Sequence, residues 1–408
     1  MLHMYDYQLE PLAETDASPV KVVVADDDAL QRAYISAILK KLGYEAHEAA
    51  DGRDALRMMH DLSAKVLVCD LDMPGMNGHE LARKIRQTED DHYIHILMVT
   101  GQNQRHERER ALEAGVDDFM AKPLDTASLT ARIRSAGRLL RHEQLLTERS
   151  RVLAEAKERF EDDLRTAADA QRRLLPPAHQ QVKGCRFHSA FTPSNILSGD
   201  MYGYFQVSDN HTGFYAIDVA GHGVHASLMS VAVGHLLTAE HFGERAFDDS
   251  GRPNPAALAG SLNRRFYRDD GTEYFTMFCG LIEHDTDTLH YCQAGYPSPY
   301  LLSRDGTARK IGNGGFPVGL LSGVSFESHS THFPKDACLA LCSDGAMEAE
   351  NRDGLPFDEE RVEAALTASA ARPEAIPDRI VDALDHWREG RTLDDDLTVL
   401  VCERTPEQ

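Results

Sequence analysis

Two aspartates set among strand-forming residues are the groups in this sequence best suited to chemistry. Asp200 lies in SGDMYGYF and Asp218 in FYAIDVAGHG, each among apolar or aromatic residues and near glycine. Such neighbours favour strands, so we expect a hairpin that holds the two carboxylates side by side. Buried anions oppose each other's ionisation, and a divalent cation with oxygen ligands, Mg²⁺ or Mn²⁺, would relieve the repulsion. Taken alone, either aspartate is more typical of a turn.

Two more acids stand at the ends of apolar runs near the C-terminus. Asp344 follows LALCS, and Asp395 lies in DDDLTVLVC. Four acids at strand ends are what a two-metal site requires, with ions about 3.5–4 Å apart that activate a water for attack on a phosphate. The four aspartates are therefore candidate catalytic residues and metal ligands.

The ordered motifs SGDMYGYF, DVAGHG, LCSDGAMEAEN and DDDLTVLV resemble those of the SpoIIE-like metal-dependent Ser/Thr protein phosphatases. QRRLLPP, AGYPSP and GGFPVGL match in the same order, so the resemblance covers about residues 166–404. It implies an α+β fold of two packed β-sheets flanked by helices. It also implies two Mn²⁺ or Mg²⁺ ions held by Asp200, Asp218, the Val219 carbonyl, Asp344 and Asp395. The adjacent Asp396 could share the last role.

This chain departs from the family at two positions. Tyr296 stands where family members often have histidine, so a polar role at that position is open. Ala220 stands where related phosphatases place a possible acid histidine. Protonation of the leaving group then falls to metal-bound water or to His222, which lies between glycines and could equally face solvent.

Further polar residues follow apolar runs between residues 20 and 138. They are Asp26, Asp27, Asp70, Thr100 and Lys122. The runs alternate with helical periodicity, which predicts a parallel sheet wrapped by helices. Ligands of such sheets bind at the carboxyl ends of the strands. We therefore expect these residues to gather at one edge.

The ordered set resembles the receiver domain of two-component response regulators, which implies an α/β receiver domain with a doubly wound, five-stranded parallel sheet. The resemblance implies a Mg²⁺ site made of Asp26, Asp27, Asp70 and the Asp72 carbonyl. Asp70 would accept a phosphoryl group from a sensor histidine kinase or phosphotransfer protein, and Lys122 would pair with the phosphoryl oxygens. Thr100 and Phe119 would form the switch pair. The chemistry fits, because carboxylate attack on phosphorus needs only positioning and charge neutralisation.

A continuous helix is expected from Asp125 to Leu175, where the sequence has no proline and one glycine. Apolar residues recur every seventh position, at Leu139, Leu146, Leu153, Phe160, Ala167 and Leu174. The companion seam is poor, which favours a weak dimeric coiled coil or, alternatively, a solvated spacer helix. A marginal coil can have two registers that phosphorylation rebalances.

The chain thus divides into an acidic lead expected to be disordered (1–19), a receiver domain (20–138), a helical coiled-coil linker (139–175) and a phosphatase domain (176–404). Strands are also expected at 274–283, 288–294 and 300–302. The net charge of −23 argues against nucleic acid as a partner. No apolar run approaches a membrane span or signal peptide, and seven cysteines without a CxxC pair favour the cytoplasm.

Two functions fit these features. In the first, a response regulator controls a Ser/Thr phosphatase that, by resemblance, acts on a phosphorylated anti-sigma-factor antagonist of the STAS type. In the second, the C-terminal domain is an inactive scaffold that sequesters a sigma-factor regulator. Retention of all four acids favours the enzyme, because a repelling cluster has no use without metal.

Overall fold

The computed structural model describes residues 19–405, except 89–92, 102–104, 222, 270 and 272. It separates into two compact units, Met1–Lys157 and Glu158–Gln408. The expected disordered lead lies outside the described residues except for Pro19, and so does His222. Within the described part, no helix combines the length and apolarity needed to cross a bilayer.

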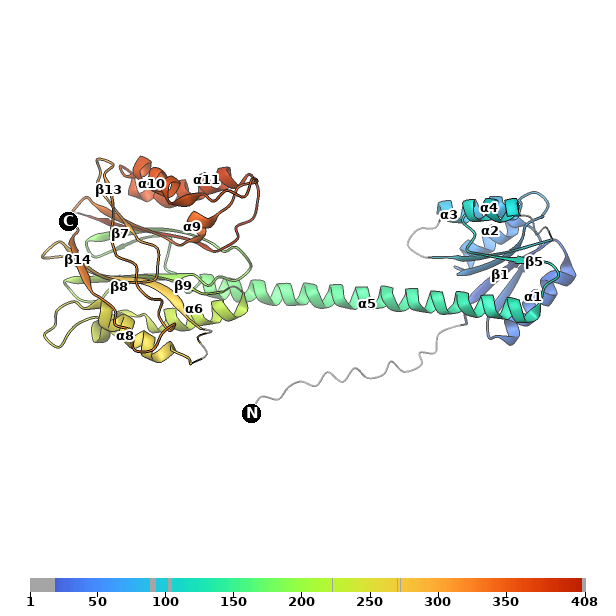
Figure 1. Ribbon diagram of the computed structural model, residues 1–408, viewed down its shortest axis with the longest axis horizontal. Coiled ribbons are helices and arrows are strands. Elements are labelled where there is room, and N and C mark those ends of the chain that lie inside the picture. Colours follow the sequence, from blue (N-terminus) through green and yellow to red (C-terminus); the bar gives the residue numbers. More distant parts are fainter. Residues whose placement is uncertain are drawn as a thin grey trace. The chain divides into compact units, whose positions relative to one another are not determined.

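The first unit is built on a parallel sheet of five strands in the order β2-β1-β3-β4-β5 (Figure 1). The strands are β1 (Lys21–Ala25), β2 (Glu45–Ala49), β3 (Val66–Asp70), β4 (His95–Thr100) and β5 (Asp118–Ala121). The helices are α1 (Ala29–Lys41), α2 (Gly52–Asp61), α3 (Gly78–Thr88), α4 (Arg105–Glu113) and α5, which begins at Thr126. This confirms the expected α/β fold.

Strands β1, β3 and β4 are buried on both faces, which explains their nearly continuous apolar sequences, whereas the edge strand β2 (EAHEA) is polar and mostly only partly buried. Side chains of β1 alternate between two cores, since successive residues point to opposite faces. Val22 and Val24 pack with Ile35 of α1 and Leu129 of α5. Val23 packs on the other side, with residues of α2 and α3.

Helix α5 runs from Thr126 to Arg172 and ends shortly before the Pro176-Pro177 pair, which cannot continue a helix. Its first turns are buried in the first unit, and Ala168 and Gln171 are buried in the second. Packing explains the glycine at position 137 of this helix, because a Cβ there would overlap the Tyr44 hydroxyl. The expected long helix is thus present.

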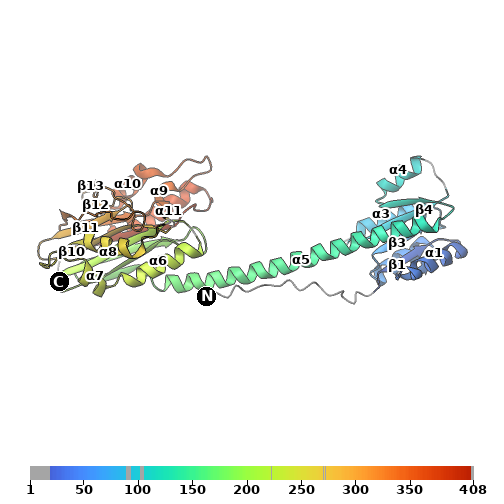
Figure 2. The same ribbon diagram turned by 60° about the horizontal axis from the view of Figure 1, so that its bottom comes forward.

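The second unit contains two antiparallel sheets that pack face to face between layers of helices (Figures 1 and 2). The five-stranded sheet has the order β14 (His329–His332), β11 (Thr288–Ala294), β10 (Phe275–Glu283), β9 (His211–Val219), β8 (Met201–Gln206). The six-stranded sheet has the order β13 (Ala308–Lys310), β12 (Tyr300–Leu302), β15 (Cys338–Cys342), β16 (Leu397–Arg404), β7 (Cys185–Thr192), β6 (His179–Val182).

Three cores separate the four layers of this unit. Phe187, Phe214 and Leu400 belong to the core between the sheets. The five-stranded sheet buries its other face against α6 (Val224–Leu236), α7 (Ala239–Arg245) and α8 (Pro255–Phe266). The six-stranded sheet does so against α9 (Gly345–Glu348), α10 (Asp358–Ser369), the short 3₁₀ turn η1 (Pro373–Ala375) and α11 (Ile376–Arg388). The expected pair of sheets flanked by helices is confirmed.

Candidate functional sites

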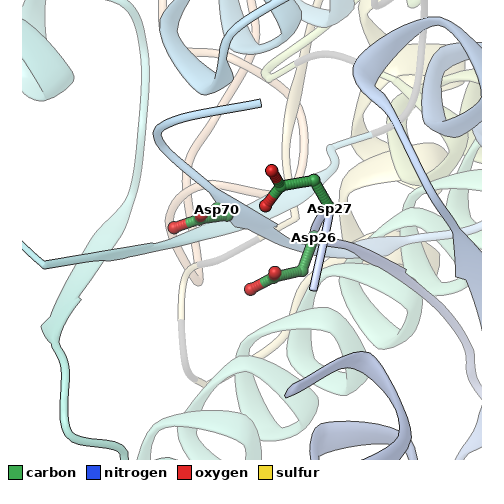
Figure 3. Close-up of side chains that lie close together, drawn as sticks. All are labelled: Asp26, Asp27 and Asp70. Atoms are coloured by element: carbon green, nitrogen blue, oxygen red, sulfur yellow. The ribbon is translucent and has the colours of Figure 1, made fainter. Parts of the chain in front are cut away.

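The first candidate site lies at the carboxyl edge of the parallel sheet. Asp26 directly follows β1 and Asp70 ends β3, and these strands are parallel neighbours with Ala25 opposite Cys69. One carboxylate oxygen each from Asp26, Asp27 and Asp70 lies within 4.8 Å of the others (Figure 3). Asp26 and Asp70 are buried, whereas Asp27 is exposed. A cluster of three carboxylate oxygens open to solvent on one side fits a hard divalent cation.

Lys122 places a positive charge against this acid cluster. Its Nζ lies 3.0 Å from Oδ1 of Asp70 and 3.4 Å from Oδ2 of Asp26. Burial raises the pKa of Asp70, while the hydrogen bond and charge of Lys122 lower it in part. The lysine therefore helps to keep Asp70 ionised.

The remaining predicted receiver residues lie close by in the fold. Thr100 ends β4 and is fully buried, and its carbonyl accepts the Lys122 N–H at 2.8 Å. Phe119 lies in β5 opposite Met98 and is partly exposed. The Asp72 side chain is exposed and is not part of the group of three carboxylates.

The second candidate site begins where β8 and β9 pair. Met201 is opposite Ile217, so Asp200 and Asp218 occupy adjoining positions, as the expected hairpin required. The Val219 N–H donates to the Gly199 carbonyl at 3.3 Å. A Cβ at Gly199 would lie 2.9 Å from the Val219 carbonyl oxygen. Glycine thus lets the two segments approach closely beside Asp200.

Asp344 and Asp395 come from neighbouring strands of the other sheet. Asp344 follows β15, Asp395 precedes β16, and Cys342 pairs with Val399. A Cβ at Gly345 would collide with the Asp396 carbonyl and lie 3.1 Å from that of Asp395. The turn carrying Asp344 therefore rests directly on the backbone of the second acidic segment.

Three hydrogen bonds tie the two halves of this site together. The Thr398 hydroxyl donates to Oδ2 of Asp200 at 2.6 Å. The Gly199 N–H donates to Oδ2 of Asp396 at 2.7 Å, and the Ser194 N–H donates to its Oδ1 at 2.8 Å. Residues separated by about half of the chain are thereby fixed against one another.

The electrostatics of this site favour a cation. Burial, followed by the charges of Asp344 and Asp395, raises the pKa of Asp218 to about 8. Burial and the charge of Asp218 raise the pKa of Asp200 well above its ordinary value. Oδ1 of Asp200 is buried and has no hydrogen-bond partner among the described residues. The carboxylates present thus fit divalent cations, which would remove their mutual repulsion.

The four acids do not form as tight a group as the first site. Among the described residues, only Asp26, Asp27 and Asp70 place three ligand oxygens within 4.8 Å of one another. The ligand oxygens of two ions about 3.5–4 Å apart are expected to be farther from one another, because each ion contacts only some of the ligands. The structure brings Asp200, Asp218, Asp344 and Asp395 into one electrostatic cluster.

Several contributors to this site were not assigned roles from the sequence. Glu348 raises the pKa of Asp344, after the larger effect of burial. The sequence could have indicated that Glu348 lies near Asp344, since residues four apart lie on the same face of a helix. Asp396, which the resemblance allowed to share the ligand role of Asp395, is buried, and both of its carboxylate oxygens accept hydrogen bonds from the Ser194 and Gly199 segments. Thr398 and Gln171 gave no signal of their contacts.

Two family models match the chain. The model described as response regulator receiver domain matches residues 22–134. The model described as Stage II sporulation protein E (SpoIIE) matches residues 208–405.

Individual relatives agree with this division. Response regulator MprA of Mycolicibacterium vanbaalenii is 37% identical over 117 residues, or 29% of this chain, and the match spans half of that protein. Regulator of RpoS of Escherichia coli K12 is 25% identical over 283 residues, 67% of this chain and 81% of that protein. The SiaA-PP2C domain of Pseudomonas aeruginosa has a TM-score of 0.52 at 19% identity, covering 62% of this chain and 99% of that domain. That likeness shows a shared fold. The chain therefore joins a response regulator receiver domain to a domain of the SpoIIE family that has the fold of PP2C phosphatases.

Proposed function

We propose that this protein is a response regulator whose output is the metal-dependent hydrolysis of phosphoserine or phosphothreonine in a protein substrate. The observation that carries the proposal is the convergence of Asp200, Asp218 and Asp344 from two sheets, with the pKa of Asp218 raised to about 8. Perturbed carboxylates gathered from distant segments are typical of catalytic and metal sites. A fold gains nothing from such repulsion unless a cation binds.

The proposed ligands of two Mn²⁺ or Mg²⁺ ions are Asp200, Asp218, the Val219 carbonyl, Asp344 and Asp395. When bound, the ions supply activation of water and neutralisation of phosphate charge. The chain's own groups position these ligands. Thr398 orients Asp200, and Asp396 braces the loop before Asp200.

In the receiver, we propose that Asp70 attacks the phosphoryl group while Mg²⁺ is held by Asp26, Asp27, Asp70 and the Asp72 carbonyl. Lys122 would neutralise the negative charge that arrives with the phosphoryl group. Thr100 and Phe119 would respond to the new charge as the switch pair. The donor would be a sensor histidine kinase or phosphotransfer protein.

Helix α5 is the proposed connection between the two activities. Its first turns are buried in the receiver core through Leu129 and Ile133. Its last turns are buried in the second unit, where Gln171 contacts the Ser198 segment. We propose that two chains pair through the exposed apolar stripe between these ends and that phosphorylation alters the pairing.

The proposed substrate is a phosphorylated anti-sigma-factor antagonist of the STAS type, on the strength of the motif resemblance. The acidic chain is unsuited to nucleic acid. A cytoplasmic location is supported by seven cysteines that are all free and buried.

Release of phosphate from such a phosphoprotein is the direct test. Wild-type protein with Mn²⁺ should release phosphate, the rate should change when Asp70 is phosphorylated, and Asp344→Asn should lose at least about a hundredfold. Asp394→Asn is a matched control, because Asp394 is an exposed neighbour in the same acidic run. If wild type and Asp344→Asn are equally inactive in both phosphorylation states and neither binds Mn²⁺, the scaffold function replaces the enzyme.

A further inference from the structure

Tyr296 lies in a turn that leads into the acid cluster. It follows β11 and Gly295, which has a φ of +80° and bridges to Met277 of β10. The residue next to Met277 in that strand, Thr276, is opposite Asp218. The turn therefore stands at the end of the five-stranded sheet where Asp218 is placed.

The backbone of this turn is held by a buried glutamine. Gln293 donates its side-chain amide to the Tyr296 carbonyl at 2.6 Å and to the Ser298 hydroxyl at 3.1 Å. Its Oε1 accepts the Gly314 N–H at 2.7 Å. With the ring only 1% exposed, the position of the Tyr296 hydroxyl is set by the fold and not by solvent.

The Tyr296 hydroxyl and Oδ1 of Asp200 are complementary groups. Both are buried, and neither has a hydrogen-bond partner among the described residues. An ionised carboxylate only accepts hydrogen bonds, whereas a phenol can donate one. Buried polar atoms are nearly always paired, so each supplies what the other lacks.

Tyr296 is close enough to the acid cluster for the charges of Asp200 and Asp218 to act on its hydroxyl. Its pKa is raised well above the ordinary value, first by burial and next by the charges of Asp200 and Asp218. A phenol has an O–H that can donate a hydrogen bond, and its ordinary pKa is about 10.

We propose that Tyr296 is a positioning residue whose hydroxyl donates a hydrogen bond, across at most one water, to Oδ1 of Asp200 and so orients that carboxylate toward a bound divalent cation. The inference rests on the proposed function, because it assigns Asp200 to a cation site. It gives this chain a specific polar role at a position where the family resemblance left the role open.

Tyr300 provides a matched control. Its hydroxyl is also buried and also lacks a partner among the described residues. Its surroundings differ from those of Tyr296. The Lys310 Nζ lies 5.6 Å from the Tyr300 ring centroid, and after burial the charge of Glu359 raises the Tyr300 pKa most. Tyr300→Phe removes an equivalent group without touching Asp200.

Manganese affinity measured by calorimetry tests the inference. The full-length chain would carry Asp26→Asn and Asp27→Asn throughout, so that binding reports on the second site. Tyr296→Phe should weaken Mn²⁺ binding about tenfold, as loss of one hydrogen bond to a charged group implies, while Tyr300→Phe stays within about twofold. At saturating Mn²⁺, the substrate KM of Tyr296→Phe should be unchanged.

A second variant separates the hydrogen bond from packing. Tyr296→His retains a ring N–H donor and should bind Mn²⁺ more tightly than Tyr296→Phe. The inference is overturned if Tyr296→Phe binds as wild type does, or if Tyr296→His binds no better than Tyr296→Phe. Absence of Mn²⁺ binding in the parent protein would overturn the proposed function and this inference together, whereas parent binding with no effect of Tyr296→Phe would overturn the inference alone.

Discussion

Gln171 donates its side-chain amide to the carbonyl oxygen of Ser198 at 2.7 Å. Its Oε1 accepts the Ser198 N–H at 3.3 Å, and its Nε2 also donates to the Ser230 hydroxyl at 3.1 Å. The last turn of α5, the segment before Asp200 and helix α6 therefore share one buried side chain. Movement of the helix end would change the backbone that sets Asp200.

Gln171→Ala should lower the phosphatase rate at saturating Mn²⁺ by about tenfold or more, because it leaves buried groups of Ser198 unpaired at a cost of about 1–3 kcal/mol. Gln144→Ala changes an exposed glutamine of the same helix and should have no effect. Steady-state phosphate release with thermal unfolding in parallel measures both. Equal rates in the two variants would show that this contact does not support the site.

Asp395 and Asp396 should differ in what they support. The charges of both residues raise the pKa of Asp218, but both carboxylate oxygens of Asp396 also accept hydrogen bonds, from the Ser194 and Gly199 N–H groups. We expect Asp395→Asn to weaken Mn²⁺ binding with little change in stability. Asp396→Asn should lower the free energy of unfolding by about 1–3 kcal/mol. Calorimetric titration measures the Mn²⁺ affinity of the two variants, and chemical denaturation measures their stability. Weaker binding in Asp396→Asn together with lower stability in Asp395→Asn would show that the two roles are reversed.

The cation-free protein should become less stable as pH rises. Asp218 has a pKa of about 8 in the fold, chiefly because of burial, against 3.8 ordinarily. Between pH 3.8 and about pH 8, the Asp218 carboxyl is therefore protonated in the folded chain but ionised in the unfolded chain. Its contribution to the free energy of unfolding is complete below pH 3.8 and is lost as the pH rises through 8. We expect the unfolding temperature to fall between about pH 6 and about pH 8.

Two comparisons check this pH effect by scanning calorimetry in the presence of a chelator. Asp218→Asn should flatten the decline, because the neutral amide does not titrate. Saturating Mn²⁺ in place of chelator should flatten it too, because the cation stabilises the ionised carboxylates. A rise in stability over the same range would contradict the assignment.

Phosphorylation of the receiver should depend on Asp70 and not on the Asp72 carboxylate. With Mg²⁺ and a small-molecule phosphodonor, Asp70→Asn should give no acid-labile phosphoprotein. Asp72→Asn keeps the backbone carbonyl and alters an exposed side chain, so its yield should stay close to wild type. Gel retardation of the phosphorylated form measures both variants. Loss of phosphorylation in Asp72→Asn alone would show that Asp72, and not Asp70, accepts the phosphoryl group.

The exposed stripe on α5 should mediate self-association. Leu146, Leu153 and Phe160 are 66%, 70% and 59% exposed at seven-residue intervals. Such a seam is typical of coiled coils. Leu146→Glu with Leu153→Glu should reduce the mass measured by light scattering from dimer to monomer, while Arg149→Glu, which changes a charged residue outside the stripe, should not. A monomeric wild type would leave α5 as a spacer.

Strands β1, β3 and β4 were predictable because they are apolar runs that lead into Asp26, Asp70 and Thr100, and burial on both faces imposes an apolar run. Strand β2 gave no such signal, since EAHEA is polar. In the second unit, the expected strands 288–294 and 300–302 match β11 and β12 residue for residue. Strands β6 and β14 gave no signal, since HQQV and HSTH are short and polar. They form because a neighbouring strand offers partners at the sheet edge.

The approach of the four aspartates to one another was predictable from the motifs and the resemblance. The contacts of the residues around them were not. Which of Asp395 and Asp396 accepts the hydrogen bonds of Ser194 and Gly199 depends on where β16 begins to pair, because side chains alternate along a strand. The contact of Gln171 likewise depends on how the end of α5 packs, which no local pattern encodes. Tertiary packing decided these cases.

The position of β16 has a consequence for synthesis. This strand follows all the other described strands of the second unit, yet it pairs with β15 on one side and β7 on the other, in the interior of its sheet. A nascent chain whose residues 395–404 are still inside the ribosome can pair β8 with β9, but it lacks the Thr398 hydroxyl that holds Asp200 and the carboxylate of Asp395. The enzyme proposed here would therefore stay silent until its closing strand inserts.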